Sequence, residues 1–387
     1  MIKEIYSIYN SLFNENAQVG SSSPGRINLI GEHTDYNNGY VLPAAIDKRI
    51  YAAFGKRSDG AIHMHSLDFD ETICVNAEEV KPFADHTWVN YILGVVAQLK
   101  NGNYCLTGFN MVVGGDVPVG AGLSSSAAME CAVMYGLNEL FQLEIEKLEM
   151  VKMAQKAEHE YAGVRCGIMD QFASVFGKKD HVIQLDCRTL YFDYKPLVME
   201  GFKIILFDTR VKHSLANSEY NIRRKQCEAG VSIIQEHIPS VKSLRDVTIR
   251  QLQEYVLPED STVYRKCKYV VEENRRLLAA CDDLEKGDIR SFGKRMFQTH
   301  EGLSILYEVS CKELDFLVDI VKTNPSVLGA RMMGGGFGGC TINLIAEHSL
   351  EEVVETVNSE YRERFGNITG VHIINIDNGA TILQQMN

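Results

Sequence analysis

A glycine- and serine-rich segment, VPVGAGLSSSAA at 117–128, restricts how this chain can fold more than any other feature. It follows a strand-like stretch, LTGFNMVV at 106–113, and precedes a good helical stretch from Ser126 to Phe141. Glycine and proline do not fit comfortably inside a helix, so the change from strand to helix has to fall near residues 122–125. The segment therefore predicts a strand–loop–helix connection.

Two explanations of this connection remain open. Glycines allow the backbone to approach an anion closely, and the amides at a helix N-terminus supply donors to it. Hydroxyl groups in the first turn can also bind Mg²⁺ beside phosphate oxygens. Alternatively, Ser124 or Ser125 simply caps the helix. The chain has no GxxxxGK[ST] loop, but GAGLSSS is more than a cap requires, so the segment favours an anion site.

A second segment, PGRINLIGEHTDY at 24–36, combines an apolar centre with a polar end. The apolar residues at 27–30 predict a short strand, after which Glu32, His33 and Asp35 emerge together. Carboxylates accept hydrogen bonds from several hydroxyl groups, so this cluster fits a polyhydroxylated ligand. An exposed polar turn after a strand is the alternative.

A third segment, GGGFGG at 334–339, holds five glycines in six positions between strand-like ARMM and CTINLI. So many glycines carry a high entropic cost and are unexpected in a plain hairpin. The segment predicts either a loop that folds over a ligand or two backbones that pack unusually close.

Two acidic residues, Glu158 and Asp170, lie in the chain between VPVGAGLSSSAA and GGGFGG. Asp170, in CGIMDQ at 166–171, is expected in the first turn of a helix, where the helix dipole stabilises a carboxylate. Glu158 lies near a predicted helix end and could be a solvated surface residue. By themselves, these positions favour structural roles.

Alternating strand and helix signals run through the whole chain. We expect an α+β protein with two domains, 1–195 and 196–387, and a junction near 190–200. The predicted strands lie at 40–56, 61–67, 71–77, 106–113, 181–186 and 202–208. The predicted helices lie at 88–100, 126–141, 146–162, 169–176 and 350–365, with a mostly helical region over 217–322.

Composition excludes several classes of function. With 39 Lys+Arg and 51 Asp+Glu, the formal charge of −12 argues against a nucleic-acid partner, which needs a clustered basic surface. No apolar run approaches the ~18 residues of a membrane span, and the N-terminus lacks secretory-signal features. The ten cysteines contain no CxxC pair, which indicates reduced, buried thiols. We expect a cytoplasmic protein without a membrane partner.

These segments, in this order and spacing, resemble the galactokinase branch of the GHMP kinase superfamily. GRINLIGEHTDY resembles the galactokinase signature, PVGAGLSSSAA the ATP-binding motif and GGGFGG the third motif of the family. CGIMDQ, and SEYNIRRKQCE at 218–228, are similar to further galactokinase blocks. The resemblance extends from position 24 to position 340.

The resemblance implies ATP-dependent phosphorylation of the anomeric 1-hydroxyl of α-D-galactose, as in galactose catabolism, with Mg²⁺ as the metal. It also implies an N-terminal mixed α/β domain against a ferredoxin-like C-terminal domain, with the active site between them. By position, Asp170 is the proposed catalytic base and Arg26 lies beside it. The implied sugar contacts are Glu32, His33, Thr34, Asp35, Gly167, Asp170 and Tyr220. The implied triphosphate contacts are Gly120, Ala121, Gly122, Leu123, Ser124, Ser125 and Ser126, with Ser126 and Glu158 holding Mg²⁺.

Two alternatives within this fold remain open, an N-acetylgalactosamine kinase and a non-catalytic galactose and ATP sensor that acts through a protein partner. Thr34 and the NNG run at 37–39 look more like the galactokinase version. The best-known sensor lacks residues directly after the serine run, whereas Ala127 and Ala128 are present here. The resemblance thus favours a kinase of galactose without an obligate protein partner. Met333 stands where the third motif often carries threonine, so a side-chain donor is lost there.

Overall fold

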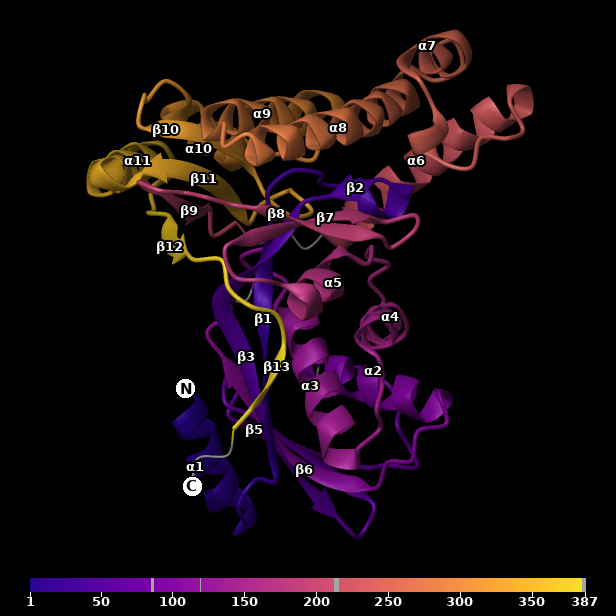
Figure 1. The fold of residues 1–387 in the computed structure, drawn as a ribbon, viewed down its shortest axis with the longest axis vertical. Coiled ribbons are helices and arrows are strands. Elements are labelled where there is room, and N and C mark those ends of the chain that lie inside the picture. The colour runs from indigo at the N-terminus through magenta and orange to yellow at the C-terminus, as the bar shows by residue number, and fades with distance from the viewer. Residues whose placement is uncertain (85–86, 119, 212–215, 385–387) are drawn as a thin grey trace.

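The N-terminal half of the chain is organised around a six-stranded sheet (Figure 1). The computed structural model describes residues 1–84, 87–118, 120–211 and 216–384. The strands of this sheet, in spatial order, are β13 (Thr381–Leu383), β1 (Val19–Asn28), β3 (Pro43–Arg57), β6 (Gly108–Gly115), β4 (Ala61–Ser66) and β5 (Glu71–Asn76). Neighbouring strands are antiparallel except for β4 and β6, which are parallel.

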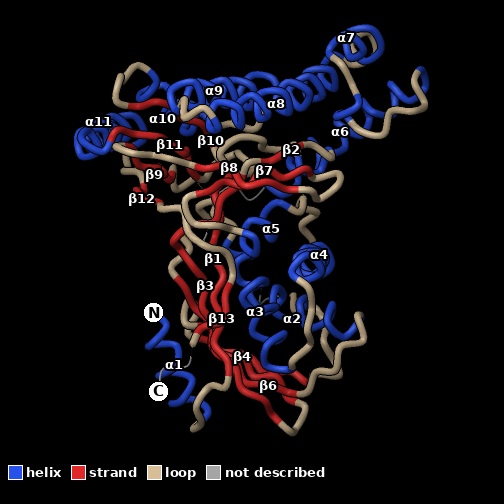
Figure 2. The backbone as a smooth tube through the Cα atoms, viewed as in Figure 1, coloured by secondary structure: helices blue, strands red, loops and turns tan. Residues whose placement is uncertain are grey.

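Helices cover the two faces of this sheet unequally (Figure 2). One face carries α2 (Thr87–Asn101), α3 (Ser125–Phe141), α4 (Lys147–Ala157) and α5 (Met169–Phe176), and the other carries α1 (Ile2–Phe13). Successive residues of a strand point to opposite faces. Phe54 of β3 therefore joins the large core beneath α3, whereas Ala53 packs with Ile5 and Tyr9 of α1.

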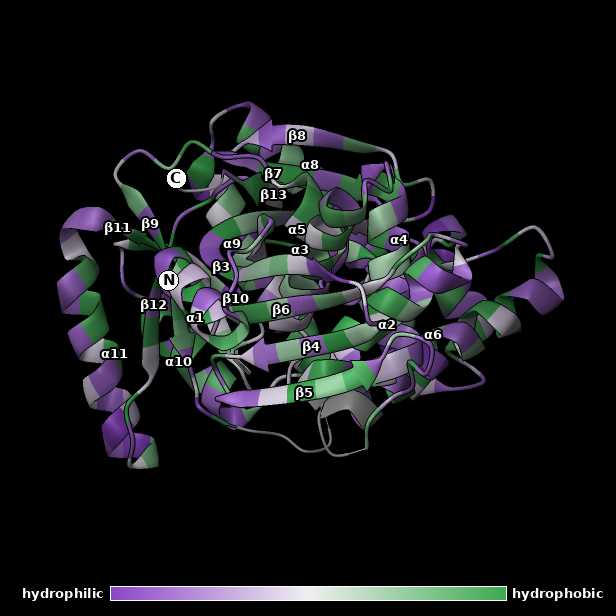
Figure 3. Ribbon diagram, turned by 90° about the horizontal axis from the view of Figure 1, so that it is seen from below, coloured by the Kyte–Doolittle hydropathy of each residue, from purple (hydrophilic) through white to green (hydrophobic). Residues whose placement is uncertain are grey.

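The C-terminal half is built on a four-stranded antiparallel sheet. Its strands, in spatial order, are β10 (Val327–Met332), β11 (Cys340–Ala346), β9 (Phe202–Asp208) and β12 (Gly370–Ile374). Helices α9 (Ile289–Glu301) and α10 (Lys312–Lys322) contact β10, and α11 (Leu350–Phe365) packs on α10. Val353, Val357 and Tyr361 recur every four residues on α11 and are buried, so green and purple residues alternate along this helix in Figure 3.

A helical region and a small sheet complete the chain. The small sheet contains β2 (Tyr40–Val41), β7 (His181–Asp186) and β8 (Phe192–Pro196). The helical region contains α6 (Ala216–His237), α7 (Ile249–Gln251) and α8 (Ser261–Glu285). Short 3₁₀ or π-helical segments are η1 (Asp35–Asn37), η2 (Glu158–Ala162), η3 (Leu244–Asp246), η4 (Leu252–Val256), η5 (Gly302–Tyr307) and η6 (Glu347–Ser349).

The two halves share one apolar core. Phe292 and Met296 of α9 belong to the same buried cluster as Leu29 at the end of β1. The chain also returns to its start, because β13 pairs with β1 and places Leu383 opposite Gly20. Within the described residues, no helix combines the length and the apolar character that a bilayer crossing requires.

Most predicted elements are confirmed, and the α+β class with them. Two expectations are wrong in extent. The helix expected over 146–162 is α-helical only to Ala157 and continues as the π-helical η2. The short strand expected at 27–30 is a long strand that ends at Asn28. Two further elements, β8 and α1, were not predicted from the sequence.

Candidate functional site

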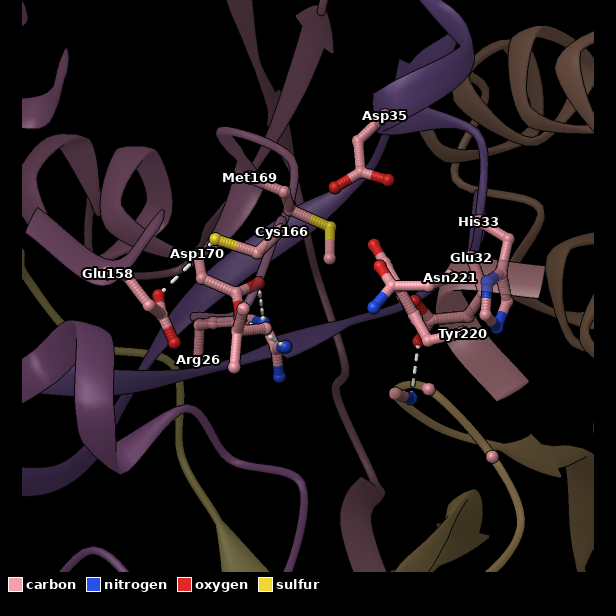
Figure 4. Close-up of a pocket in the computed structure, with 14 residues that line it drawn as sticks. Arg26, Glu32, His33, Asp35, Glu158, Cys166, Met169, Asp170, Tyr220 and Asn221 are labelled. Carbon is pink, nitrogen blue, oxygen red and sulfur yellow. Dashed lines mark hydrogen bonds and ion pairs between the residues drawn. The ribbon is translucent and has the colours of Figure 1, made fainter. Parts of the chain in front are cut away.

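A cavity of about 270 Å³ lies where the loop after β1 meets α5, α6 and the glycine loop after β10 (Figure 4). The residues that line it are Arg26, Glu32, His33, Asp35, Glu158, Val164, Cys166, Met169, Asp170, Tyr220, Asn221, Gly334, Gly335 and Gly336. Figure 4 shows Arg26, Asp170 and Glu158 on one side of the cavity, and Glu32 and His33 on the other. Segments about 300 residues apart in the chain therefore share one site.

Arg26 and Asp170 form a two-pronged ion pair at this cavity. Arg26 Nε donates to Asp170 Oδ1 at 2.7 Å, and a terminal nitrogen donates to Oδ2 at 2.9 Å. The other terminal nitrogen donates to the carbonyl oxygen of Gly122 at 2.6 Å. Burial alone would lower the pKa of Arg26, but the charge of Asp170 and its hydrogen bonds raise it. A guanidinium can hold a carboxylate and a loop carbonyl at once because its donors lie in one rigid plane.

The serine run does not cap α3 with its side chains. Ser124 is the N-cap residue in a left-handed conformation with φ of 56°, and its side chain makes no capping hydrogen bond to the described first turn of the helix. The Ser124 hydroxyl instead donates to Asp170 Oδ2 at 2.6 Å. The capping explanation is therefore wrong, and the amides of the first turn remain available to an anion.

Ser126 and Glu158 lie together next to this ion pair. The Ser126 hydroxyl donates to Glu158 Oε1 at 3.1 Å, and Gln171 Nε2 donates to Glu158 Oε2 at 2.6 Å. The same Gln171 amide donates to the buried Glu130 at 3.0 Å. Burial, and then the charge of Asp170, raise the pKa of Glu158. One hydroxyl and one carboxylate suit Mg²⁺, which takes few protein ligands and completes its shell with phosphate oxygens and water. Among the described residues no cluster of three or more acidic, His or Cys ligands exists.

Glu32 is held on the opposite wall by groups from both halves of the chain. Arg331 donates to Glu32 Oε1 at 3.0 Å, and the Gly334 amide donates to the same oxygen at 2.8 Å. Asn28 Nδ2 donates to Oε2 at 3.0 Å. Arg331 is fully buried, and it also donates to the carbonyl oxygens of Leu29, at 2.7 Å, and of Asn28. The position of Glu32 is thereby fixed.

His33 and Tyr220 lie side by side at the same wall. Their ring centroids are 5.3 Å apart, and His33 is 4% exposed. Burial lowers the pKa of His33 to about 4, so the ring is neutral near pH 7. Burial also raises the pKa of Tyr220 well above its ordinary value. Both groups therefore offer neutral hydrogen-bonding atoms to a ligand.

Asp35, in the same loop as Glu32 and His33, also lines the cavity. Burial, and then the charge of Asp170, raise the pKa of Asp35 to about 7. A methyl group on Gly167 would overlap the Asp35 carboxylate, so glycine is required there. Thr34 has a different environment, because its hydroxyl donates to Gly31 O at 2.8 Å and to Tyr40 O at 2.5 Å. Thr34 therefore shapes the loop that presents its neighbours.

The segment expected to hold the triphosphate lies against the third glycine loop. Gly120 and Gly122 have φ of 80° and 76°, whereas Ala121 and Leu123 are buried. A Cβ atom on Gly122 would lie 3.8 Å from the carbonyl oxygen of Met333. Val119, within the same sequence motif, lies outside the described residues. The two glycine-rich segments thus face one another beside the cavity.

Close packing of two backbones, one of the two explanations of the third glycine segment, is confirmed, and the segment also lines the cavity. Gly334, Gly335 and Gly336 line the cavity, and Gly336 has φ of 86°. A methyl group on Gly336 would overlap the carbonyl oxygen of Val309, so the backbones pack closely. Met333 is buried, and its amide donates to Cys340 O at 3.0 Å. Its side chain therefore belongs to the core.

Sequence reasoning missed Arg331, Gln171 and Asn28, which hold the carboxylates of this site. One signal was present for Arg331, because a charged residue inside the apolar stretch ARMM has to be paired if it is buried. The amides of Gln171 and Asn28 gave no comparable signal.

Family comparisons agree with this arrangement. The chain matches the galactokinase galactose-binding signature over residues 7–56. It also matches the GHMP kinase N-terminal domain over 90–178 and the GHMP kinase C-terminal domain over 280–363. A galactokinase of Thermotoga maritima is 44% identical over 89% of this chain and 94% of its own length. A galactokinase of Clostridium beijerinckii is 40% identical over 98% of each chain.

Solved structures show the same relationship. The galactokinase of Lactococcus lactis, crystallised with galactose, matches 97% of this chain and 98% of its own at a TM-score of 0.93 and 34% identity. A mevalonate kinase matches 93% of this chain and 99% of its own at a TM-score of 0.65 and 19% identity. At this low identity, the match shows a shared fold only. The GHMP kinase architecture expected from the sequence is therefore confirmed. Because galactokinases that are 40% and 44% identical to this chain match it over nearly their whole length, the chain belongs to the galactokinase family.

Proposed function

We propose that this chain transfers the γ-phosphoryl group of ATP to the anomeric 1-hydroxyl of α-D-galactose, giving galactose 1-phosphate and ADP. One observation carries the proposal. Asp170, on the wall of a monosaccharide-sized cavity, is bonded both to Arg26 and to Ser124 at the start of α3. The carboxylate thus touches the sugar site and the anion-binding helix terminus at the same time.

The sugar occupies the cavity with its 1-hydroxyl toward Asp170. Glu32, His33, Asp35 and Tyr220 surround the remaining hydroxyl groups, and Gly167 leaves room for Asp35. Buried acceptors of fixed position discriminate sugars strongly, because a misplaced hydroxyl leaves one of them unpaired. The fixed carboxylate of Glu32 suits this role.

ATP lies along residues 120–126, with its γ-phosphate toward the cavity. The glycines at 120 and 122 and the uncapped amides of α3 supply main-chain donors to the phosphates. We propose that Ser126 and Glu158 would hold Mg²⁺, and that the ion would neutralise charge on the transferring group. Glu158 is aimed there by the Gln171 amide.

Phosphoryl transfer requires mainly positioning and neutralisation of charge. Asp170 accepts a hydrogen bond from the 1-hydroxyl and takes its proton as the oxygen attacks the γ-phosphorus. Arg26 fixes both oxygens of Asp170 and ties them to the phosphate-binding loop through Gly122. Ser124, bonded to the same carboxylate, completes the alignment.

A coupled ADP-release assay across galactose, its epimers and N-acetylgalactosamine tests the proposal. We expect kcat/KM to be highest for galactose, and the product to be galactose 1-phosphate by NMR. Preference for N-acetylgalactosamine would replace the sugar assignment. Binding of galactose and ATP without release of ADP would identify a sensor instead of an enzyme.

We further propose that the protein acts in the cytoplasm, on its own, with galactose and ATP as its only obligate ligands besides the metal. All ten cysteines are free thiols, which suits a reducing compartment. An enzyme without an obligate protein partner should reach full activity as the purified chain.

A further inference from the structure

His33 is held in an unusual backbone conformation with one ring nitrogen unpaired. Its φ is 61°, in the left-handed region that non-glycine residues rarely adopt. Among the described residues, His33 Nε2 is buried without a hydrogen-bond partner, and the residue lines the cavity. A strained residue that leaves a buried polar atom unpaired indicates that a ligand completes the hydrogen bond.

The other ring nitrogen begins a buried chain of hydrogen bonds. His33 Nδ1 lies 2.7 Å from the Tyr36 hydroxyl, which lies 2.8 Å from the Tyr307 hydroxyl. The Tyr307 hydroxyl in turn lies 3.3 Å from Cys227 Sγ. Tyr307 and Cys227 are fully buried and His33 is nearly so, so these three groups have little access to water. The chain runs from the sugar cavity into the packed interior beneath α6 and α8.

Such a chain restricts where its protons lie. Each tyrosine hydroxyl has one proton to donate. A hydrogen bond between two of these groups therefore requires that one of them points its proton at the other. If Tyr36 donates to His33 Nδ1, then Tyr307 donates to Tyr36, and Nε2 carries the ring proton. If His33 Nδ1 donates to Tyr36, then Tyr36 donates to Tyr307, and Nε2 is an acceptor. The direction of donation along these hydrogen bonds and the tautomer of His33 are therefore coupled.

We propose that Tyr36, Tyr307 and Cys227 form a positioning relay that fixes the tautomer and orientation of His33. The role of this relay in sugar binding rests on the proposed function. The relay thereby decides which kind of hydrogen bond His33 makes to one hydroxyl of the sugar. Tyr36 and Tyr307 are positioning residues, because they act on the ligand through His33. The relay therefore contributes to sugar discrimination from outside the set of residues that contact the sugar.

The hydrogen bonds of this relay can be separated from the packing of its aromatic rings. The ring centroids of Tyr36 and Tyr307 lie 5.8 Å and 4.9 Å from that of His33. Phenylalanine would keep these contacts and would remove only the hydroxyl group. Tyr36→Phe therefore separates hydrogen bonding from packing, and Tyr361→Phe is a matched control. Tyr361 is also fully buried and donates to Thr209 O at 2.9 Å, and neither residue lines the cavity.

The first test reads the tautomer directly in the ligand-free protein. With ¹⁵N-histidine labelling, the His33 ring should show one neutral tautomer in the wild type and a mixture in Tyr36→Phe. Tyr361→Phe should retain the wild-type spectrum. The same single tautomer in Tyr36→Phe would overturn the proposal, whatever the enzyme's substrate proves to be.

The second test uses a panel of monodeoxygalactoses. We expect Tyr36→Phe to lower kcat/KM for galactose roughly tenfold, about the effect of one hydrogen bond to a neutral group. For one deoxy sugar, the loss in kcat/KM caused by Tyr36→Phe should be less than about twofold. His33→Ala should affect the turnover of that same deoxy sugar least. Equal losses across the panel would overturn the proposal. Failure of the wild type to phosphorylate galactose would instead count against the proposed function.

Discussion

Three of the four carboxylates that line the cavity differ in what surrounds them. Asp170 is paired with Arg26, and Glu32 is paired with Arg331. Asp35 is instead buried close to Asp170, and burial and that charge raise its pKa to about 7. Three similar side chains can therefore carry three different roles in one site.

Asp170→Asn tests the role of the proposed base. We expect kcat to fall by a factor of ~10²–10⁴, because the amide cannot accept the proton from the sugar. Galactose binding should survive within about tenfold, since the neighbouring groups of the cavity remain. Single-turnover kinetics and calorimetry measure the two quantities. A kcat near that of the wild type would remove Asp170 from the mechanism.

Asp35→Asn tests the raised pKa of Asp35. Folding favours the protonated carboxyl, so its stabilising contribution is present below the ordinary pKa of 3.8 and is lost as the pH rises through about 7. Asparagine resembles the neutral form at every pH. In ligand-free protein, the variant should therefore gain more in Tm over the wild type at pH 8 than at pH 5.

The exposed Asp319 supplies the control for this experiment. Asp319→Asn should change Tm little at either pH. A Tm difference between Asp35→Asn and the wild type that is the same at pH 5 and pH 8 would contradict the account.

At the scale of elements, helices with a regular apolar pattern could be predicted from the sequence, whereas the full length of the polar strand β1 could not. The helices at 126–141 and 350–365 were found from their periodicity. β1 was underestimated because Ser21, Ser22 and Ser23 are buried in it, and the Ser21 hydroxyl donates to Ala132 O at 2.6 Å. Burial of these serines depends on the neighbouring helix α3, which no local pattern reveals.

The third glycine loop offers a test at this scale. Gly336 and Gly287 both have positive φ, at 86° and 69°, but only at Gly336 does a backbone atom occupy the place of a Cβ. Gly287→Ala should lower the free energy of unfolding by about 1–2 kcal/mol, the cost of the conformation alone. Gly336→Ala should cost a further ~1–3 kcal/mol through its overlap with Val309. Urea denaturation measures both, and equal costs would contradict the close packing of this loop.

At the scale of the molecule, the site depends on pairings between distant parts of the chain. The three motifs and their order were predictable. The structure brings residues of the first and third motifs to one cavity, and Ser124 of the remaining motif is bonded to Asp170 at its wall. The partners of the motifs were not predictable, because Arg331 reaches Glu32 across 299 positions of sequence. Such contacts are set by the packing of β10 against the end of β1, not by any local preference.

Arg331→Met tests this long-range contact. The substitution leaves Glu32 buried without its cation, so we expect a loss of roughly 3–5 kcal/mol in the free energy of unfolding. Adding Glu32→Gln removes the uncompensated charge and should restore part of that loss. Urea denaturation of the two single variants and the double variant measures the coupling. Strictly additive effects would show that the pair is not coupled.

The central claim is that one cavity aligns a sugar hydroxyl with both Asp170 and the phosphates held at residues 120–126. A crystal structure with galactose and a non-hydrolysable ATP analogue tests it most directly. We predict the 1-hydroxyl oxygen roughly 3–3.5 Å from the γ-phosphorus and within hydrogen-bonding distance of Asp170. A sugar bound away from Asp170, or a triphosphate bound away from the start of α3, would contradict the account.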